Sequence, residues 1–244
     1  MDNLISVITS DIIGSSQLSE PELKVLQQGI SLFPDLCKKQ FPEICTDLFT
    51  SFTNYRGDEY QIVLNKPEYG FRIAILLRLF VFMRTPYGEL NDSNKNNFKN
   101  EWKQQLNKKM LYDIRSSVGI GSKSDVLEDN GQAFVLSGHG LDALKSQKRA
   151  FSIDTEWKDS KINDILKLNM EIIERYMSRW KPVHGRIAAY YMMNVPRDVI
   201  MKKTHVSSSA VSQAIAATNV DFIKRIIESM EDIIRAKINN ACSL

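Results

Sequence analysis

Two aspartates stand at positions where paired carboxylates can do phosphate chemistry. Asp11 follows the apolar, β-branched run from Leu4 to Thr9, and Asp58 lies between two strand-like runs at residues 48–53 and 60–64. If these strands are neighbours in a sheet, the two carboxylates meet at one edge. Mg²⁺ and Mn²⁺ prefer oxygen ligands, and Mg²⁺ is typically held by one or two carboxylates together with substrate phosphates. The sequence therefore predicts a divalent-metal site that contains both aspartates.

Glu59 is a further candidate metal ligand because it directly follows Asp58. Each aspartate also has a simpler explanation. Gly57-Asp58 is a common pair in hairpin turns, and an aspartate at the end of a strand, such as Asp11, often caps a following helix. The sequence leaves both interpretations open.

A second group of candidate residues lies near the C-terminus. Arg197 to Lys203 has the length of a short helix, Thr204 to Ser207 that of a turn, and Ser208 to Ile215 that of a second helix with small polar residues on one face. This order is typical of a helix-turn-helix, whose second helix enters the major groove of DNA. Side chains there contact base edges and phosphates. The predicted DNA contacts are Lys202, Lys203, His205, Ser208, Ser209, Ser212 and Gln213.

An all-helical packing or dimerisation module is the alternative for this region. Residues 155–244 contain 14 basic and 10 acidic side chains, an excess of +4 that is small for a DNA-binding face. In favour of DNA, Ala210-Val211-Ser212-Gln213 resembles the recognition helix of many bacterial helix-turn-helix proteins. The apolar stripe of residues 220–234 has helical spacing and is wide enough for a partner helix, so we expect a homodimer.

Other kinds of site are not indicated. Cys37, Cys45 and Cys242 are far apart and form no C-x-x-C pair, which argues against a disulfide framework and a thiolate zinc site. The three histidines match no zinc spacing, and no nucleophile is accompanied by a base. The N-terminal residues lack the pattern of a signal peptide. We therefore expect a cytoplasmic protein in a reducing compartment.

A predicted sheet positions the carboxylates. Strands are expected at residues 4–9, 48–53, 60–64, 114–121 and 150–153, and helices at 19–33, 68–84 and 131–145. The spacing from Ser19 to Glu22 is that of a capping box at the start of the first helix. Residues 91–109 are rich in Asn and Lys and are predicted to be a surface insertion. The order β-α-β-β-α-β, with an extra helix and strand, is that of a ferredoxin-like α+β fold.

After Asp154 the pattern becomes helical throughout, with helices expected at residues 163–176, 185–193, 197–203, 208–218 and 220–239. We therefore predict an α+β domain at 1–154, a linker at 155–162 and a helical, helix-turn-helix domain at 163–244. Residues 73–83 are apolar but number only 11, whereas about 20 are needed to cross a membrane, so no membrane contact is expected. Gly138 and Gly140 indicate either a close approach or a break in the helix that contains them.

Four sequence blocks, Val7–Gly14, Tyr55–Gln61, Arg115–Gly121 and Gly131–Phe134, occur in the order found in the SatD-like bacterial family and resemble it. They are also similar to blocks of class III nucleotidyl cyclases and GGDEF diguanylate cyclases. The resemblance covers most of residues 4–146, and the family's C-terminal helix-turn-helix extends it. It implies that Asp11 and Asp58 bind metal, that the Ile12 carbonyl is a further ligand, and that the turn of residues 12–16 faces phosphates.

Three departures from the cyclase pattern concern activity. Asn54 stands where cyclases usually have a purine-selecting Lys or Glu, so the base preference is open. Val135 and His139 stand where cyclases have the Asn and Arg that stabilise the transition state, which argues against cyclisation. Arg56 replaces the first glycine of the GGDEF motif, which argues against diguanylate synthesis. The predicted nucleotide contacts are Ile13, Gly14, Ser15, Ser16, Asn54, Arg56, Gly57 and His139.

Three functions account for these patterns. The first is a DNA-binding regulatory protein whose degenerate cyclase-like domain senses a nucleotide with Mg²⁺ or Mn²⁺. The second is an active nucleotidyl cyclase or nucleotidyltransferase that uses two metal ions on a nucleoside triphosphate. The third is a homo-oligomeric assembly protein without a small ligand, in which residues 71–83 and 220–234 form the contacts. The sequence favours the first.

Overall fold

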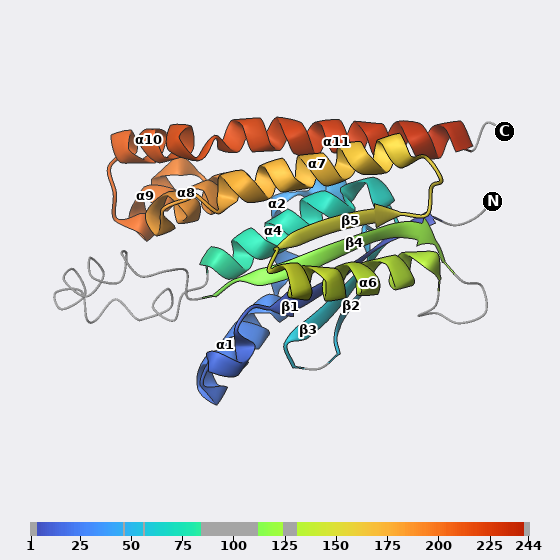
Figure 1. Cartoon of the computed structure of the whole chain (residues 1–244). Coiled ribbons are helices and arrows are strands. Elements are labelled where there is room, and N and C mark those ends of the chain that lie inside the picture. Colours follow the sequence, from blue (N-terminus) through green and yellow to red (C-terminus); the bar gives the residue numbers. More distant parts are fainter. Residues whose placement is uncertain (1–3, 46, 56, 84–111, 124–130, 242–244) are drawn as a thin grey trace.

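The computed structural model describes residues 4–45, 47–55, 57–83, 112–123 and 131–241 (Figure 1). The sheet region contains β1 (Leu4–Ile12), α1 (Glu20–Ser31), α2 (Phe33–Gln40), α3 (Pro42–Cys45), β2 (Phe49–Asn54), β3 (Glu59–Leu64), α4 (Gly70–Met83), β4 (Ile114–Ser122), α6 (Gln132–Gln147) and β5 (Phe151–Thr155), with short 3-10 helices η1 (Ser15–Gln17) and η2 (Pro67–Tyr69). The helices that follow are α7 (Ser160–Met177), α8 (Pro182–Met192), α9 (Arg197–Thr204), α10 (Ser208–Thr218) and α11 (Val220–Ala241). The insertion predicted at residues 91–109 lies outside the described residues.

The five strands form one mixed sheet in the order β2-β3-β1-β4-β5. β1 pairs antiparallel with β3 and β4, β2 pairs antiparallel with β3, and β5 lies parallel to β4. The first four strands and their connections have the predicted split β-α-β arrangement. α6 and β5 are the predicted extra helix and strand. The α+β fold class is confirmed.

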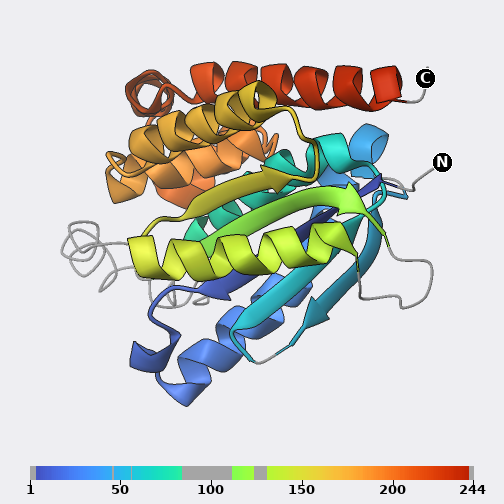
Figure 2. The ribbon, with the colours of Figure 1, turned by 45° about the vertical axis from the view of Figure 1, so that its right-hand side comes forward.

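The two faces of β1 are covered by different helices because successive side chains of a strand point to opposite faces. Ile8 and Ile12 belong to the main hydrophobic cluster, which includes the buried side of α4. Ile5 and Val7 pack instead with Ala133 of α6. Figure 2 shows α6 lying across the front of the sheet. Asp11 follows Ile5 and Val7 at an even spacing, so its side chain projects from the face of the sheet that α6 covers.

Glycines let α6 lie very close to the sheet. A Cβ atom on Gly119 of β4 would overlap the Ala133 carbonyl oxygen, and one on Gly140 of α6 would overlap the Ser117 hydroxyl. A Cβ on Gly138 would meet no atom within 4 Å. α6 is continuous through both of its glycines. Of the two explanations for this pair, close approach therefore holds at Gly140, and a break in the helix does not occur.

The predicted first helix is interrupted. The capping box from Ser19 to Glu22 is present at the start of α1, with Ser19 N donating to Glu22 Oε2 at 2.9 Å. α1 ends at Ser31, however, and α2 begins at Phe33 with Pro34 in its first turn. Proline has no N–H for the bond of a continuing helix but fits the first turn of a new one. The prediction of a helix after the capping box is confirmed by α1, but Phe33, the last residue of the predicted range 19–33, belongs to α2.

The C-terminal helices share a core with the sheet region. Figure 1 shows α7 and α11 side by side above β5. The cluster that contains Ile8 also includes Leu166 of α7 and Ile223, Ile227 and Ile234 of α11. The stripe at 220–234 that we assigned to a partner helix is thus largely buried within the chain itself, as is most of residues 71–83. The homodimer stays a prediction, but these two surfaces do not support it. None of the helices in the described part of the chain is long and apolar enough to span a bilayer.

Candidate functional site

Three charged residues form a row across the sheet at the end of β1. Asp11 lies directly opposite Glu59 of β3 on one side and Arg115 of β4 on the other. Residues that face each other across paired strands project from the same face of a sheet. All three side chains therefore lie on the face covered by α6, whose last turn carries Lys145.

Asp11 and Arg115 form an ion pair with incomplete hydrogen bonding. Arg115 Nε lies 3.3 Å from Asp11 Oδ2, and the two side chains are only 15% and 13% exposed. The buried Nε atom has no hydrogen-bond partner in the described part of the chain. Burial raises the pKa of Asp11, the positive charges of Lys145 and Arg115 oppose this shift, and the carboxylates of Asp58 and Glu59 reinforce it. The Asp11 carboxylate thus lies among charges of both signs.

Asp58 is held against the end of β1 by two hydrogen bonds. Ile12 N donates to the Asp58 carbonyl oxygen at 3.0 Å, and the Ser15 hydroxyl donates to Asp58 Oδ2 at 2.6 Å. The hairpin that carries Asp58 turns at Gly57, which has a φ of 79°. Asn54 closes this turn by accepting from Gly57 N at 2.8 Å. The hairpin therefore brings the two aspartates, 47 positions apart in the sequence, to one end of the sheet.

The turn after β1 is anchored to the rest of the sheet region. Gly14 has a φ of 74°, and the 3-10 helix η1 follows it. Ile13 N donates to the Asp113 carbonyl oxygen at 2.9 Å, and the Asp113 carboxylate accepts two hydrogen bonds from Arg78 of α4 at 2.6 and 2.7 Å. The predicted phosphate-facing residues Ile13, Gly14 and Ser15 are half-buried, and Ser16 is exposed.

Some predicted nucleotide contacts are not gathered at the carboxylates. Val135 and His139 are exposed on α6, and the structure gives neither a contact with Asp11 or Asp58 within the described residues. Asn54 is exposed, and its side chain bonds to the backbone of Gly57. Arg56 lies outside the described residues. The site as described thus consists of the carboxylates, the turn after β1 and nearby cations.

The donor set at this end of the sheet is not a complete metal cage. Among the described residues, no three or more His, Cys, Asp or Glu side chains are grouped so as to hold a metal ion. Mg²⁺, however, often takes only one or two carboxylates and completes its shell with substrate phosphates and water. Two aspartates beside the positive charges of Arg115 and Lys145 fit that mode. Neither cation was predicted from the sequence. Arg115 lies opposite Asp11 because of the strand register, and Lys145 lies near it because α6 covers this face of the sheet; local sequence pattern determines neither of these.

The second candidate site is the helical pair α9 and α10. α9 ends at Thr204 and is followed by His205, which has a φ of 53°, and Ser207 caps α10 by accepting a hydrogen bond from Ala210 N at 3.3 Å. Helices α8, α9 and α10 are held together by a separate apolar cluster that contains Ile187, Ile200, Val211 and Ala214. The predicted helix-turn-helix order of elements is therefore present and has its own small core.

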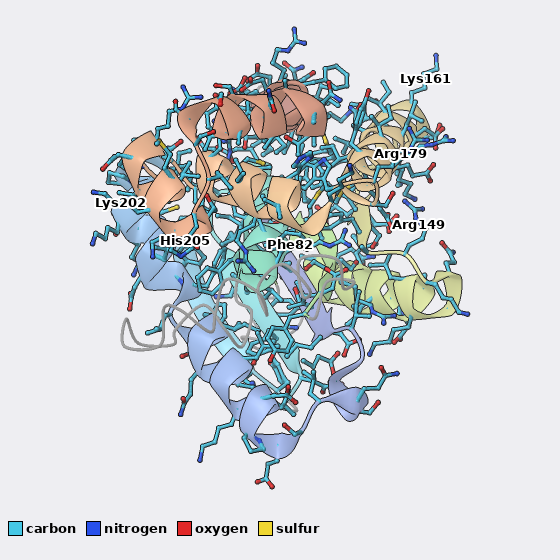
Figure 3. All side chains as sticks on the ribbon, turned by 90° about the vertical axis from the view of Figure 1, so that its left-hand side faces the viewer. Phe82, Arg149, Lys161, Arg179, Lys202 and His205 are labelled. Atoms are coloured by element: carbon cyan, nitrogen blue, oxygen red, sulfur yellow. The ribbon has the colours of Figure 1, made fainter. Side chains whose placement is uncertain are left out.

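The seven predicted DNA contacts are all exposed on α9, the turn and α10. Figure 3 shows Lys202 and His205 close together on one side of this end of the molecule, away from Arg149 and Arg179. Arg197 adds a basic side chain that the prediction missed: its Nη2 atom donates to the Ser208 carbonyl oxygen at 3.2 Å and also contacts the Ser212 hydroxyl. This links the start of α9 to the first turns of α10.

Comparison with known proteins yields a distant structural match. No family model matches the chain, and no curated protein sequence matches it. One solved structure with detectable similarity comes from a structural analysis of adenylate cyclases from Trypanosoma brucei in their monomeric state. It is 12% identical, covers 52% of this chain and 60% of the cyclase chain, and has a TM-score of 0.30. The SatD-like resemblance stays a prediction, and the chain is distantly similar in structure to an adenylate cyclase over about half its length.

Proposed function

We propose that this protein binds a nucleotide together with Mg²⁺ or Mn²⁺ at the carboxylate end of its sheet. The observation that carries the proposal is the hydrogen bond from Ile12 N to the Asp58 carbonyl oxygen, because it fixes the hairpin so that Asp58 lies beside Asp11. These two carboxylates would hold the metal. Arg115 and Lys145 would lie beside the negatively charged phosphates, and the turn that contains Gly14 and Ser15 would border them.

Binding without conversion is the form of this function that the residues support best. A cyclase or nucleotidyltransferase must stabilise charge that develops on the phosphate during reaction. Val135 and His139, at the positions where cyclases supply that stabilisation, are a hydrophobic residue and an exposed histidine. The metal would supply charge neutralisation of the phosphates, and the protein would retain the nucleotide as a signal.

The test is to incubate the purified protein with each of the four ribonucleoside triphosphates and Mg²⁺ or Mn²⁺, and to follow products and retained ligand by mass spectrometry. The Asp11→Asn/Asp58→Asn variant should lose retention, whereas Asp142→Asn, a change at an exposed position of α6, should not. Retained, unconverted nucleotide is the expected result. A product that disappears in the double variant would instead make the protein an active nucleotidyl cyclase or nucleotidyltransferase. Equal retention by all three proteins would contradict the site.

A second candidate function, DNA binding, is favoured by the exposure of all seven predicted contacts on α9 and α10. We expect Lys202→Ala/Lys203→Ala to weaken retention on duplex DNA and to reduce the salt dependence of binding by about two charges. Lys158→Ala/Lys161→Ala removes the same charge from exposed positions before and at the start of α7 and is the matched control. Equal loss in both variants would show that the effect is general electrostatics and not an α10 interface.

The two functions together describe a nucleotide-sensing, DNA-binding regulatory protein. A structural connection runs from the turn after β1 through Asp113 and Arg78 to α4. α4 in turn packs closely on α8, where a side chain at Gly185 would collide with the Phe82 ring. Measuring DNA retention with and without Mg²⁺ and nucleotide tests this regulation, and identical retention in both conditions would contradict it.

A further inference from the structure

The ion pair between Arg115 and Asp11 differs from the other arginine pairs near the sheet. Arg78 bonds Asp113 through Nε and Nη2 at 2.6 and 2.7 Å, and Arg72 bonds Glu231 through the same two atoms at 2.6 and 2.9 Å. Such two-point bonding is the strong geometry for a guanidinium and a carboxylate. Arg115 approaches Asp11 at 3.3 Å through Nε, which makes no hydrogen bond although it is buried. The guanidinium neutralises Asp11 without binding it tightly.

A metal ion on Asp11 would compete with this guanidinium. Both are cations, both require the same carboxylate oxygens, and at short distance in a half-buried site like charges repel strongly. The other side chain directly opposite Asp11 is Glu59, so among the described strands only β4 places a cation directly across from Asp11. Lys145 on α6 lowers the pKa of Asp11 more than Arg115 does, but Lys145 is exposed, whereas the Arg115 side chain is largely buried beside the carboxylate.

We propose that Arg115 is an internal counter-ion of Asp11, that a divalent cation displaces it, and that the released guanidinium then binds a phosphate of the nucleotide. This inference rests on the proposed function and adds to it the residue that recognises the phosphates. Because one displaced charge serves both ligands, metal and nucleoside triphosphate bind cooperatively, and each binds weakly alone. On this proposal, the buried Arg115 Nε has no hydrogen bond because its acceptor is a phosphate oxygen of the nucleotide.

The test has two measurements: binding of Mn²⁺ alone, from the electron paramagnetic resonance signal of free Mn²⁺, and binding of ATP with excess Mn²⁺, from equilibrium dialysis of the nucleotide. In Arg115→Met, we expect Mn²⁺ alone to bind about tenfold more tightly, since its competitor is gone, and ATP with Mn²⁺ to bind about tenfold more weakly. These opposite signs are not expected of a merely structural residue. Lys148→Met, which removes an exposed charge just after α6, is the matched control and should change neither value.

Arg115→Lys keeps the charge and guards against misfolding of the methionine variant. It should keep Mn²⁺ binding alone weak and should restore part of the ATP affinity. Unchanged or weaker Mn²⁺ binding in folded Arg115→Met, while the wild-type protein binds Mn²⁺ with ATP, would overturn the counter-ion role and leave the proposed function intact. Absence of Mn²⁺ binding in the wild type and in both variants, with and without ATP, would overturn the proposed function and this inference together.

Discussion

Two arginine–carboxylate regions on opposite faces of the sheet have different designs. Between α4 and α11, Arg72 and Glu231 make two short hydrogen bonds, and the Glu231 side chain is 6% exposed. At the end of β1, Arg115 and Asp11 make one longer contact, and the Asp11 side chain is 13% exposed. The two hydrogen bonds fix the first pair in one geometry, whereas Arg115 of the second pair keeps a hydrogen-bond donor without an acceptor among the described residues.

This difference separates an ion pair that stabilises the fold from one whose groups keep unused hydrogen-bonding capacity. Arg72 and Glu231 belong to the two predicted domains and join them within one core. Removing one partner of a completely bonded buried pair has a high free-energy cost because the remaining charge is left without a partner. An incompletely bonded pair can change partners at lower cost. Substitutions on the two faces of the sheet test this contrast through the free energy of unfolding.

Glu231→Gln should produce the largest loss of stability. It leaves the buried Arg72 guanidinium without a counter-charge, and we expect the free energy of unfolding to fall by about 3–5 kcal/mol. Asp232→Asn is the control in the next position of α11, where an exposed ion pair with Arg235 contributes little. Chemical denaturation of both variants gives the comparison. A small and equal effect in the two would show that the α4–α11 contact does not depend on this pair.

Gly140→Ala should destabilise by about 1–3 kcal/mol, because the new Cβ overlaps the Ser117 hydroxyl and forces α6 away from the sheet. The same change at Gly138 meets no neighbouring atom, so it should stabilise by up to about 1 kcal/mol through helix propensity. Thermal unfolding of the two variants measures how tightly α6 covers the row of Asp11 and Arg115. Stabilisation by both alanines would contradict the close packing described above.

Tyr60→Phe should have the smallest effect and the opposite sign. The Tyr60 hydroxyl is buried without a hydrogen-bond partner in the described part of the chain, so its removal should stabilise by about 1 kcal/mol at neutral pH. Burial raises the pKa of Tyr60 from 10.0 to about 12; the nearby Asn54 side chain opposes this shift, and the Asp58 carboxylate reinforces it. The stability that comes from keeping this phenol neutral is therefore present below pH 10 and is lost as the pH rises through about 12.

The advantage of Tyr60→Phe over the wild type should accordingly grow between pH 10 and about 12. Denaturant unfolding at pH 7, 10 and 11.5 follows it, with Tyr55→Phe, at an exposed position of the same hairpin, as the control. A difference that stays constant over this pH range would mean that the buried phenol does not titrate with folding.

The elements of the fold that depend on local sequence pattern were predicted well. Alternation and β-branched residues located the five strands to within a few positions, and the hairpin signal at Asn54 to Asp58 placed one aspartate near the other. The helical spacing over residues 208–218 predicted the bounds of α10. In each case the responsible interactions join residues close in the sequence, so the pattern itself contains the information.

Long-range pairing was not predictable in the same way. The contact of Asp11 with Arg115 depends on the register of β1 against β4, which is set by packing across 104 positions. The burial of Ile223 and Ile227 inside this chain, and not between two chains, depends on how α11 folds back over α4 and α7. An apolar stripe indicates that one face of a helix is covered, but it does not identify the element or the chain that covers it.

The most direct test of the central claim is the number of Mn²⁺ ions bound per chain in the presence of a non-hydrolysable nucleoside triphosphate, for the wild type and for Asp58→Asn. Asparagine can still accept the hydrogen bond from Ser15, so the hairpin should stay in place while one metal-binding charge is lost. We expect the wild type to retain Mn²⁺ and nucleotide together and the variant to lose both. Equal retention in the two proteins would contradict a metal–nucleotide site at Asp11 and Asp58.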